Sequence, residues 1–198
     1  GTREIVKSYA AKHPEKIRAF LNDREHVIYI DGKPTGRWNF LNTLSHAKGT
    51  YIALLEGDDY WLDAHKLQKQ VDFLETNPNC ALCFHSTQHV YEDESRSSWI
   101  FSPPIKRKFY HLKDLLDFNM IDTGAIVFRR DVLPAYPEWL WEVPMADWPL
   151  QILIAQHGLA GYIDEVMGAY RFHQAGRWST DEQSQKAEAA IQVYNIRN

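Results

Sequence analysis

Cysteine is scarce in this sequence, which has only Cys80 and Cys83 among its 198 residues. Both precede His85 and His89, so a zinc site is one interpretation of the segment. A structural zinc site normally separates two pairs of ligands by a long spacer, whereas these four side chains are nearly contiguous. The spacing therefore favours a buried strand with inert thiols in a reducing compartment.

Strong net charge and long apolar runs are also missing. The formal net charge of −4 provides no broad cationic field, so we expect no nucleic acid partner. No run approaches the roughly 20 apolar residues of a membrane-spanning helix. We expect a cytoplasmic protein, or one that is peripheral to the inner face of the membrane.

Helical spacing and strand-like runs alternate along the chain, which is typical of an α/β fold. With no repeat or linker visible, we expect a single domain over residues 1–198. Thr2 is the expected N-cap of the first helix, and 31–36 is an expected loop. The expected helices are 3–12, 38–47, 63–77, 112–118, 147–157 and 181–196, and the expected strands are 17–21, 27–30, 51–55, 81–85, 124–128 and 162–172.

Three carboxylates follow the apolar run 51–55, which has the pattern of a buried strand: Glu56, Asp58 and Asp59. Ligand sites in open α/β sheets lie at the carboxyl ends of strands. Two unit charges about 4 Å apart repel by about 4 kcal/mol at an effective dielectric near 20, so such a group needs solvent, a proton or a cation. Mg²⁺ prefers such carboxylates together with phosphate oxygens. The alternative is a solvated acidic loop that leads to an N-cap at Asp63.

The stretch 49–78 resembles glycosyltransferase family 2, because it combines the acidic segment with Lys66-Leu67 on the helix that follows. The resemblance implies the GT-A fold, a Rossmann-like mixed sheet flanked by helices, with an Asp-X-Asp motif. It implies that Asp58 binds Mg²⁺ or Mn²⁺ and the donor diphosphate, with Asp59 in support. Glu56 takes the place of the first acid and departs from the commoner Asp.

A second segment, around Asp147, resembles the family's Glu-Asp-Trp motif. Physically, Asp147 is a good N-cap for the helix, with Pro149 in the first turn. The resemblance implies that it is also the catalytic base, with Ala146 replacing the usual first acid. A carboxylate is the right residue type, because the acceptor hydroxyl has to lose a proton. Trp148, beside it, is the expected acceptor residue.

The third segment is Tyr170-Arg171-Phe172-His173, which resembles the family's Tyr-Arg-X-His strand end. The resemblance implies that His173 is a metal ligand or diphosphate contact and that Arg171 lies nearby. The alternative is a surface histidine that ends a strand. Residues 174–178 also spell the Gln-X-X-Arg-Trp signature of processive synthases, which thread polymer through a membrane channel. Without a spanning helix we interpret this match as chance within a flap, in which Trp178 stacks on an acceptor ring.

The start of the chain suggests that one or more strands are missing from this fold. The helix over 3–12 needs a sheet edge on which to bury its apolar face, and Gly1-Thr2 resembles the end of the family's Asp-Asp-X-Ser-X-Asp-Gly-Thr segment. About 30 residues would complete a βαβ unit. An exposed sheet edge could then pair with a second copy to form a homodimer. Arg37 and Asn39 are expected on the donor side, because they begin the helix after the glycine loop.

Together these features predict a metal-dependent, inverting hexosyltransferase of bacterial polysaccharide biosynthesis. It would move a sugar from a nucleoside-diphosphate sugar to a hydroxyl of a glycan or lipid-linked acceptor. Two alternatives stay open, namely a Mg²⁺-dependent phosphohydrolase built on the same acidic strand end, and a non-catalytic module that binds a glycan or a protein partner.

Overall fold

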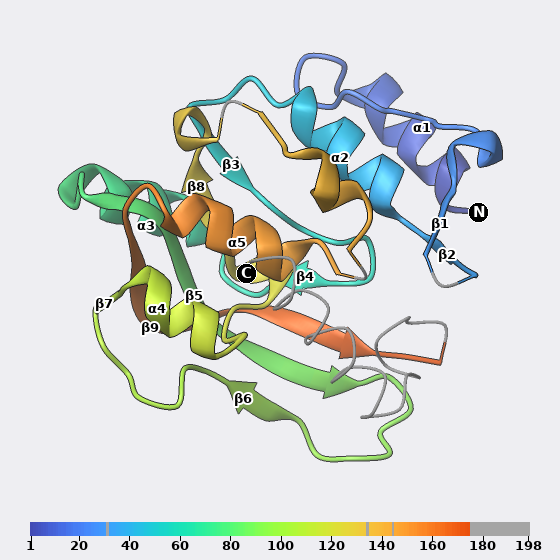
Figure 1. The fold of residues 1–198 in the computed structure, drawn as a ribbon. Helices are drawn as coiled ribbons and strands as arrows, with labels where there is room; N and C mark the ends of the chain where they lie inside the picture. The colour runs from blue at the N-terminus through green and yellow to red at the C-terminus, as the bar shows by residue number, and fades with distance from the viewer. Residues whose placement is uncertain (31, 134, 144, 175–198) are drawn as a thin grey trace. The chain divides into compact units, whose positions relative to one another are not determined.

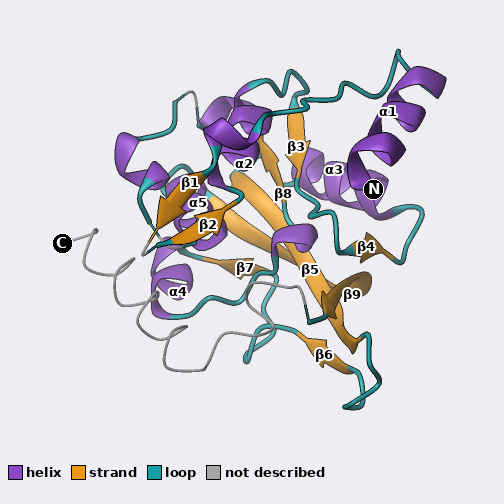
Figure 2. Ribbon diagram, turned by 90° about the vertical axis from the view of Figure 1, so that its right-hand side faces the viewer, coloured by secondary structure: helices purple, strands orange, loops and turns teal. Residues whose placement is uncertain are grey.

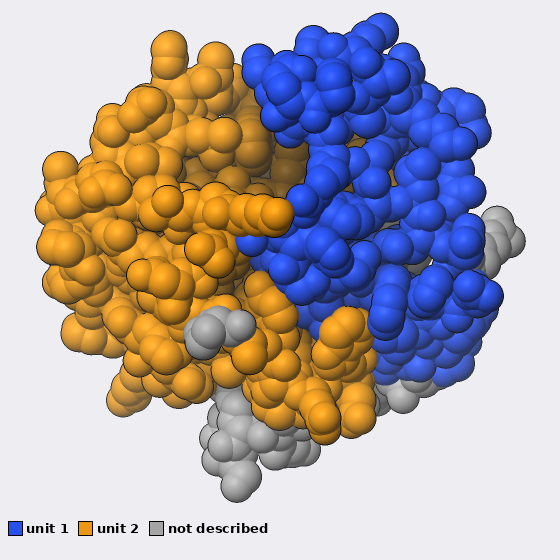
Figure 3. All heavy atoms as spheres, turned by 90° about the horizontal axis from the view of Figure 1, so that it is seen from above, with its two compact units in different colours: residues 1–47 blue, residues 48–198 orange. Residues whose placement is uncertain are grey.

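The computed structural model describes residues 1–174 except 31, 134 and 144 (Figure 1). The chain divides into two compact units, residues 1–47 and 48–198, which Figure 3 shows in different colours. In the described part of the chain, no helix is long and apolar enough to cross a membrane.

The first unit consists of two helices and a small hairpin. Its elements are α1 (Thr2–Lys12), the 3-10 turn η1 (Arg24–His26), β1 (Ile28–Ile30), β2 (Lys33–Thr35) and α2 (Arg37–Ser45). The hairpin is closed by Thr35 Oγ1, which donates a hydrogen bond to the carbonyl of Ile28 over 2.8 Å. Part of the expected loop 31–36 is therefore the strand β2, and that prediction was wrong.

Two further expectations for this unit were wrong. Gly1, not Thr2, is the N-cap of α1. The segment 17–21 is not a strand, and no described strand pairs with it. Two of its side chains contact the end of α2 instead. Arg18 donates a hydrogen bond to the carbonyl of His46 over 2.7 Å, and Phe20 packs on the ring of His46. An apolar run forms a strand only where a partner satisfies its backbone groups.

The second unit is built on a seven-stranded mixed sheet of order β3-β8-β5-β9-β4, with β6 on β5 and β7 on β9. Among the strands that the structure describes in this unit, only β5 and β9 pair in parallel, and the other pairs are antiparallel. The prediction of an α/β fold with a mixed sheet flanked by helices is confirmed. The strands are β3 (Tyr51–Ala53), β4 (Tyr60–Trp61), β5 (Cys80–Tyr91), β6 (Trp99–Phe101), β7 (Phe109–Tyr110), β8 (Val127–Arg129) and β9 (Leu159–Phe172).

Helices cover both faces of this sheet. Figure 2 shows α3 (Lys66–Thr76) on one face and both α4 (Leu112–Asp117) and α5 (Asp147–Ala155) on the other. Three 3-10 turns complete the unit: η2 (Thr123–Ala125), η3 (Arg130–Val132) and η4 (Glu138–Trp141). The predicted helices and strands from residue 51 to 172 occur in the expected order, although their boundaries differ and β4, β6 and β7 were not predicted. The expected helix 181–196 lies outside the described residues.

The core on the α3 face contains both cysteines. Leu74 packs with the buried Cys80, Cys83 and Val127, and both thiols are free. In the described residues, the one group of side chains that could hold a metal is elsewhere, so the zinc interpretation was wrong and the buried strand was right. Burial raises the pKa of the Cys83 thiol to about 12, which makes it unreactive.

The buried face of α3 is more polar than its sequence suggests. Asp63 is not the N-cap; that position is His65, whose backbone N–H donates to Asp63 Oδ1 over 2.7 Å. The helix therefore begins at Lys66 and buries Lys66, Gln70 and Leu74. Leu67, the first apolar residue of the helix, is 42% exposed. Polar side chains therefore share the buried face of α3 with Leu74.

Candidate active site

The loop between β3 and β4 gathers the three acidic side chains singled out in the sequence. One carboxylate oxygen from each of Glu56, Asp58 and Asp59 lies within 4.8 Å of the others. The loop turns on itself, since the backbone N–H of Asp59 donates to the carbonyl of Glu56. It then enters β4, which pairs with β9 through Tyr60 opposite Ala169. The sheet thus anchors the exit of the loop and keeps the acids together.

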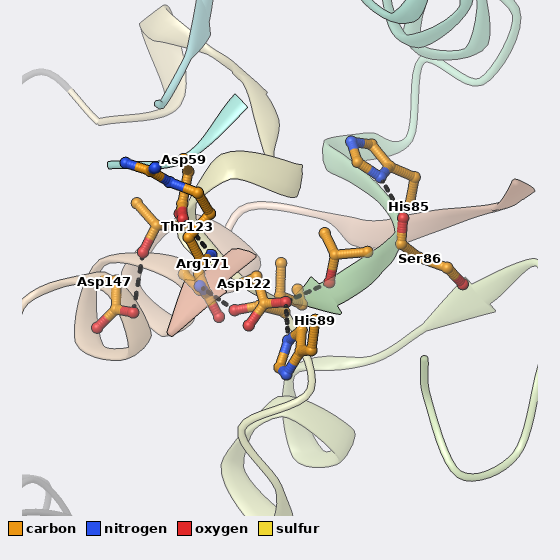
Figure 4. A network of polar contacts seen from close by, with 11 residues as sticks. Asp59, His85, Ser86, His89, Asp122, Thr123, Asp147 and Arg171 are labelled. Atoms are coloured by element: carbon orange, nitrogen blue, oxygen red, sulfur yellow. Dashed lines mark hydrogen bonds and ion pairs between the residues drawn. The ribbon is translucent and has the colours of Figure 1, made fainter. Parts of the chain in front are cut away.

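The end of β9 supplies the partners of this acidic loop (Figure 4). The backbone N–H of Arg171 donates to Asp59 Oδ1 over 2.9 Å, and its guanidinium Nε donates to the carbonyl of Asp58. His173 Nε2 lies 3.0 Å from Asp58 Oδ2. Two segments more than a hundred residues apart, which the sequence predicted separately, therefore meet.

The carboxylates of this site repel one another. The pKa of Glu56 is raised to about 8, chiefly because neighbouring protein displaces water from its carboxylate, although the residue as a whole is exposed. Asp147, Asp58 and Asp59 add repulsion. The pKa of Asp59 is raised to about 6 by burial, against the hydrogen bond from Arg171. Protons or a cation have to offset this negative charge.

Asp147 lies at the start of α5 and takes part in the same electrostatic environment. It is the first residue of the helix, after the N-cap Ala146, so the prediction of Asp147 as N-cap was wrong by one position. Thr123 Oγ1 donates to Asp147 Oδ2 over 3.1 Å. Burial raises the pKa of Asp147, while the backbone N–H of Trp148 and the hydroxyl of Thr123 oppose this rise. A carboxylate with a raised pKa is a better general base than an exposed one.

A second polar network next to these acids was missed by sequence reasoning. Asp122 Oδ2 accepts hydrogen bonds from Thr87 Oγ1 and from His89 Nε2, the latter at 2.7 Å. Figure 4 shows Asp122 and His89 joined in this way, with Thr123 and Asp147 in the same network view. The available signal was the alternation of Thr87 and His89, which places both on one face of a strand.

Other predicted site residues lie elsewhere. Trp148 is buried, and its indole N–H donates to the carbonyl of Leu115 over 2.7 Å, so it cannot stack on an acceptor and that prediction was wrong. Arg37 and Asn39 belong to the first unit, where Asn39 Oδ1 accepts a hydrogen bond from Asn22. Their donor role stays a prediction. Trp178 lies outside the described residues.

The chain is similar in sequence to a known family and to several known proteins. Residues 1–136 match the family described as glycosyl transferase family 2. An uncharacterized protein of Mycobacterium tuberculosis and one of Mycobacterium bovis are each 36% identical over 178 residues, which is 90% of this chain and 48% of theirs. The chain thus spans about half the length of these relatives. TuaG of Bacillus subtilis, provisionally named as a teichuronic acid biosynthesis glycosyltransferase, is 34% identical over 93 residues, 47% of this chain and 32% of TuaG.

Proposed function

This chain belongs to glycosyl transferase family 2, and we propose that it moves a sugar from a nucleoside-diphosphate donor to a hydroxyl of a glycan or lipid-linked acceptor, with inversion. The observation that carries the proposal is one electrostatic site made from separate segments. The acidic loop, the end of β9 and the start of α5 all contribute, because Asp147 is among the charges that raise the pKa of Glu56.

The donor set of the acidic loop suits Mg²⁺ or Mn²⁺. Hard divalent cations prefer oxygen ligands, and oxygens of Glu56, Asp58 and Asp59 lie within 4.8 Å of one another. Burial, and after it repulsion between neighbouring carboxylates, raises the pKa values of Glu56 and Asp59. Asp58 would hold the ion, with His173 beside it as a further ligand. A bound ion would offset the charge that develops on the leaving diphosphate.

The side chain of Asp147 would take the proton of the acceptor hydroxyl. The acceptor oxygen forms a bond to the anomeric carbon while the bond from that carbon to the diphosphate breaks, and the hydroxyl proton passes to Asp147. Thr123 holds one carboxylate oxygen of Asp147 in place. A single displacement of this kind inverts the anomeric centre. On the side of the leaving group, Arg171 would contact the diphosphate from the end of β9.

The experiment compares Asp147→Asn with the unchanged chain. Nucleoside diphosphates and their sugars are first screened with Mn²⁺ by thermal shift, since a ligand that binds only the native state raises the melting temperature. For the donor found, we expect Asp147→Asn to lower kcat by about 10²- to 10⁴-fold while the donor Kd stays within about twofold. Asp164→Asn, at an exposed position of β9, is the matched control.

Turnover that is unchanged in Asp147→Asn would refute the assignment of the base. Phosphate release from simple phosphomonoesters without any sugar acceptor would instead favour a phosphohydrolase. Glycan binding that is indifferent to Mn²⁺ and nucleotide would favour a binding module.

A further inference from the structure

A small pocket lies beside the acidic loop and is lined in part by Asp59, Trp61, Asp122, Gly124 and Tyr170. Its volume is about 10 Å³, which is enough for one water-sized group and far too little for a sugar ring. Two of these walls are aromatic and two are carboxylates. The pocket therefore suits a single hydroxyl group.

Asp122 is held rigidly at this pocket. Both of its hydrogen bonds, from Thr87 Oγ1 and His89 Nε2, end on the same oxygen, Oδ2. The two donors are 3% and 6% exposed, so solvent does not compete for them. The His89 ring is fixed in turn by Trp99 and Phe101, whose ring centroids lie 4.4 Å and 5.0 Å away.

This arrangement leaves the second oxygen of Asp122 available. Within the described part of the chain, Asp122 Oδ1 makes no hydrogen bond. A carboxylate oxygen is a strong acceptor for a hydroxyl group, and sugars carry several hydroxyl donors. Because Oδ2 of the same carboxylate is anchored, Oδ1 accepts a hydrogen bond from one direction only. A fixed acceptor of this kind can discriminate between sugars that differ in the orientation of one hydroxyl group.

The position of the pocket indicates whether it would bind a hydroxyl group of the transferred donor sugar or of the acceptor. One wall is Asp59, in the loop proposed to hold the metal and the donor diphosphate. The neighbour of Asp122 in the chain, Thr123, holds the proposed base. The sugar being transferred has to lie between the diphosphate and the base, whereas the rest of the acceptor lies beyond the base.

We propose that Asp122 is a specificity-determining residue, whose Oδ1 accepts a hydrogen bond from one hydroxyl group of the transferred donor sugar. That hydroxyl group alone enters the pocket. The inference rests on the proposed function, since it names how the same site would choose its donor.

The test uses the full chain, with UDP-glucose, UDP-galactose, UDP-N-acetylglucosamine, UDP-N-acetylgalactosamine and GDP-mannose as donors in hydrolysis and transfer assays. Monodeoxy analogues of the best donor then locate the recognised hydroxyl. In Asp122→Asn the amide oxygen still accepts from Thr87 and His89, so the NH₂ group faces the pocket and the acceptor becomes a donor. The exposed Asp117→Asn, on α4, is the matched control.

For the unchanged chain we expect loss of one hydroxyl to lower kcat/KM by about 10- to 100-fold, as for a hydrogen bond to a charged group. The ratio of kcat/KM for the complete donor to kcat/KM for the deoxy donor should fall below about threefold in Asp122→Asn. In Asp117→Asn this ratio should equal that of the unchanged chain. A ratio between two donors on one enzyme cancels any loss of folded protein, so a merely structural role would not move it.

An active Asp122→Asn variant that keeps the full ratio would overturn the inference and leave the proposed function intact. An Asp122→Asn variant that changes only the KM of the acceptor would also overturn the inference, because the pocket would then bind the acceptor and not the transferred sugar. If the unchanged chain neither binds nor turns over any donor, the proposed function fails, and this inference fails with it.

Discussion

Thr123 Oγ1 donates a hydrogen bond to Asp147 Oδ2 across 3.1 Å, which joins the turn η2 to the first residue of α5. Thr123 is only 5% exposed, so water does not substitute for the bond. The hydroxyl stabilises the ionised carboxylate and lowers the pKa of Asp147, whereas burial raises that pKa. The basicity of the proposed catalytic group is therefore set by two opposed influences.

Replacing Thr123 by Val should move the acid limb of the kcat profile to higher pH. The variant keeps the shape of the side chain but removes the donor, so the ionised form of Asp147 is less stable and its pKa rises. We expect a displacement of about one pH unit, the equivalent of one hydrogen bond to a charged group. The measurement is kcat against pH with saturating donor and Mn²⁺. Thr123→Ser keeps the hydroxyl and should restore the original limb; identical profiles for the two variants would exclude this role.

Glu56 should make the metal-free protein less stable as pH rises. Its pKa is about 8 in the folded state and about 4.3 when unfolded, so within this window the native state binds more protons than the unfolded state. The free energy of unfolding then falls as pH rises from about 4.3 to 8, and this fall ends above pH 8.

Urea unfolding in EDTA at several pH values tests this expectation. Glu56→Gln should lessen the fall, whereas Glu138→Gln, at an exposed residue of η4, should not. Mn²⁺ added at pH 8 should stabilise the unchanged chain more than Glu56→Gln. Equal slopes for the two glutamine variants would count against a destabilising ionised Glu56.

The acidic loop could be predicted from the sequence because its chemistry is local. Glu56, Asp58 and Asp59 are adjacent in the chain, directly after an apolar run, and no long-range contact is needed to gather them. The resemblance to a family then singled out Arg171 and His173, which follow the part of β9 that pairs with β4, the strand directly after the loop.

The alternation of Thr87 and His89 indicates a shared face but not their partner Asp122, which lies more than thirty residues along the chain. The apolar pattern ends at His85, yet β5 continues to Tyr91 and buries Ser86, Thr87 and His89. These side chains are tolerated inside because Ser86 bonds the hydroxyl of Tyr162 at 2.6 Å and the other two bond Asp122. Burial of a polar group is determined by a partner far along the chain.

Trp148 shows why adjacency along a helix misleads. Its neighbour Asp147 contributes to the site, but successive residues of a helix differ by about 100° in direction. The indole therefore points to the carbonyl of Leu115 in the core and not to the site.

Gly158 should be intolerant of a side chain. A Cβ at this position would lie 2.7 Å from the carbonyl oxygen of Asn79 and 2.9 Å from the backbone nitrogen of Ala81, where β5 and β9 begin to pair. Since backbone atoms cannot move aside easily, we expect Gly158→Ala to destabilise the fold by about 1–3 kcal/mol. Urea unfolding measures this effect. Gly36→Ala is the control, because nothing lies within 4 Å of its Cβ, and a loss of stability there as large as at Gly158 would refute the steric argument.

The buried ammonium of Lys66 should give the protein a rise in stability at alkaline pH. Lys66 is 1% exposed, its Nζ donates to Gln70 Oε1 over 2.7 Å, and it lies 4.4 Å from the centre of the Trp61 ring. Burial lowers its pKa to about 8, compared with about 10.4 in the unfolded chain. Between these values the unfolded state binds more protons than the native state, so the free energy of unfolding rises with pH.

Two substitutions of Lys66 separate its charge from its packing. Lys66→Met has nothing to titrate, and Lys66→Arg stays charged up to pH 12, so both should lose the rise between pH 8 and 10. Lys66→Arg should also be the less stable of the two throughout, because it keeps a buried charge that cannot be neutralised. The measurement is urea unfolding followed by tryptophan fluorescence, with Lys113→Met, at an exposed position of α4, as the control that keeps the rise. If Lys66→Met also kept the rise, another group would be responsible and the buried Lys66 ammonium would not be its cause.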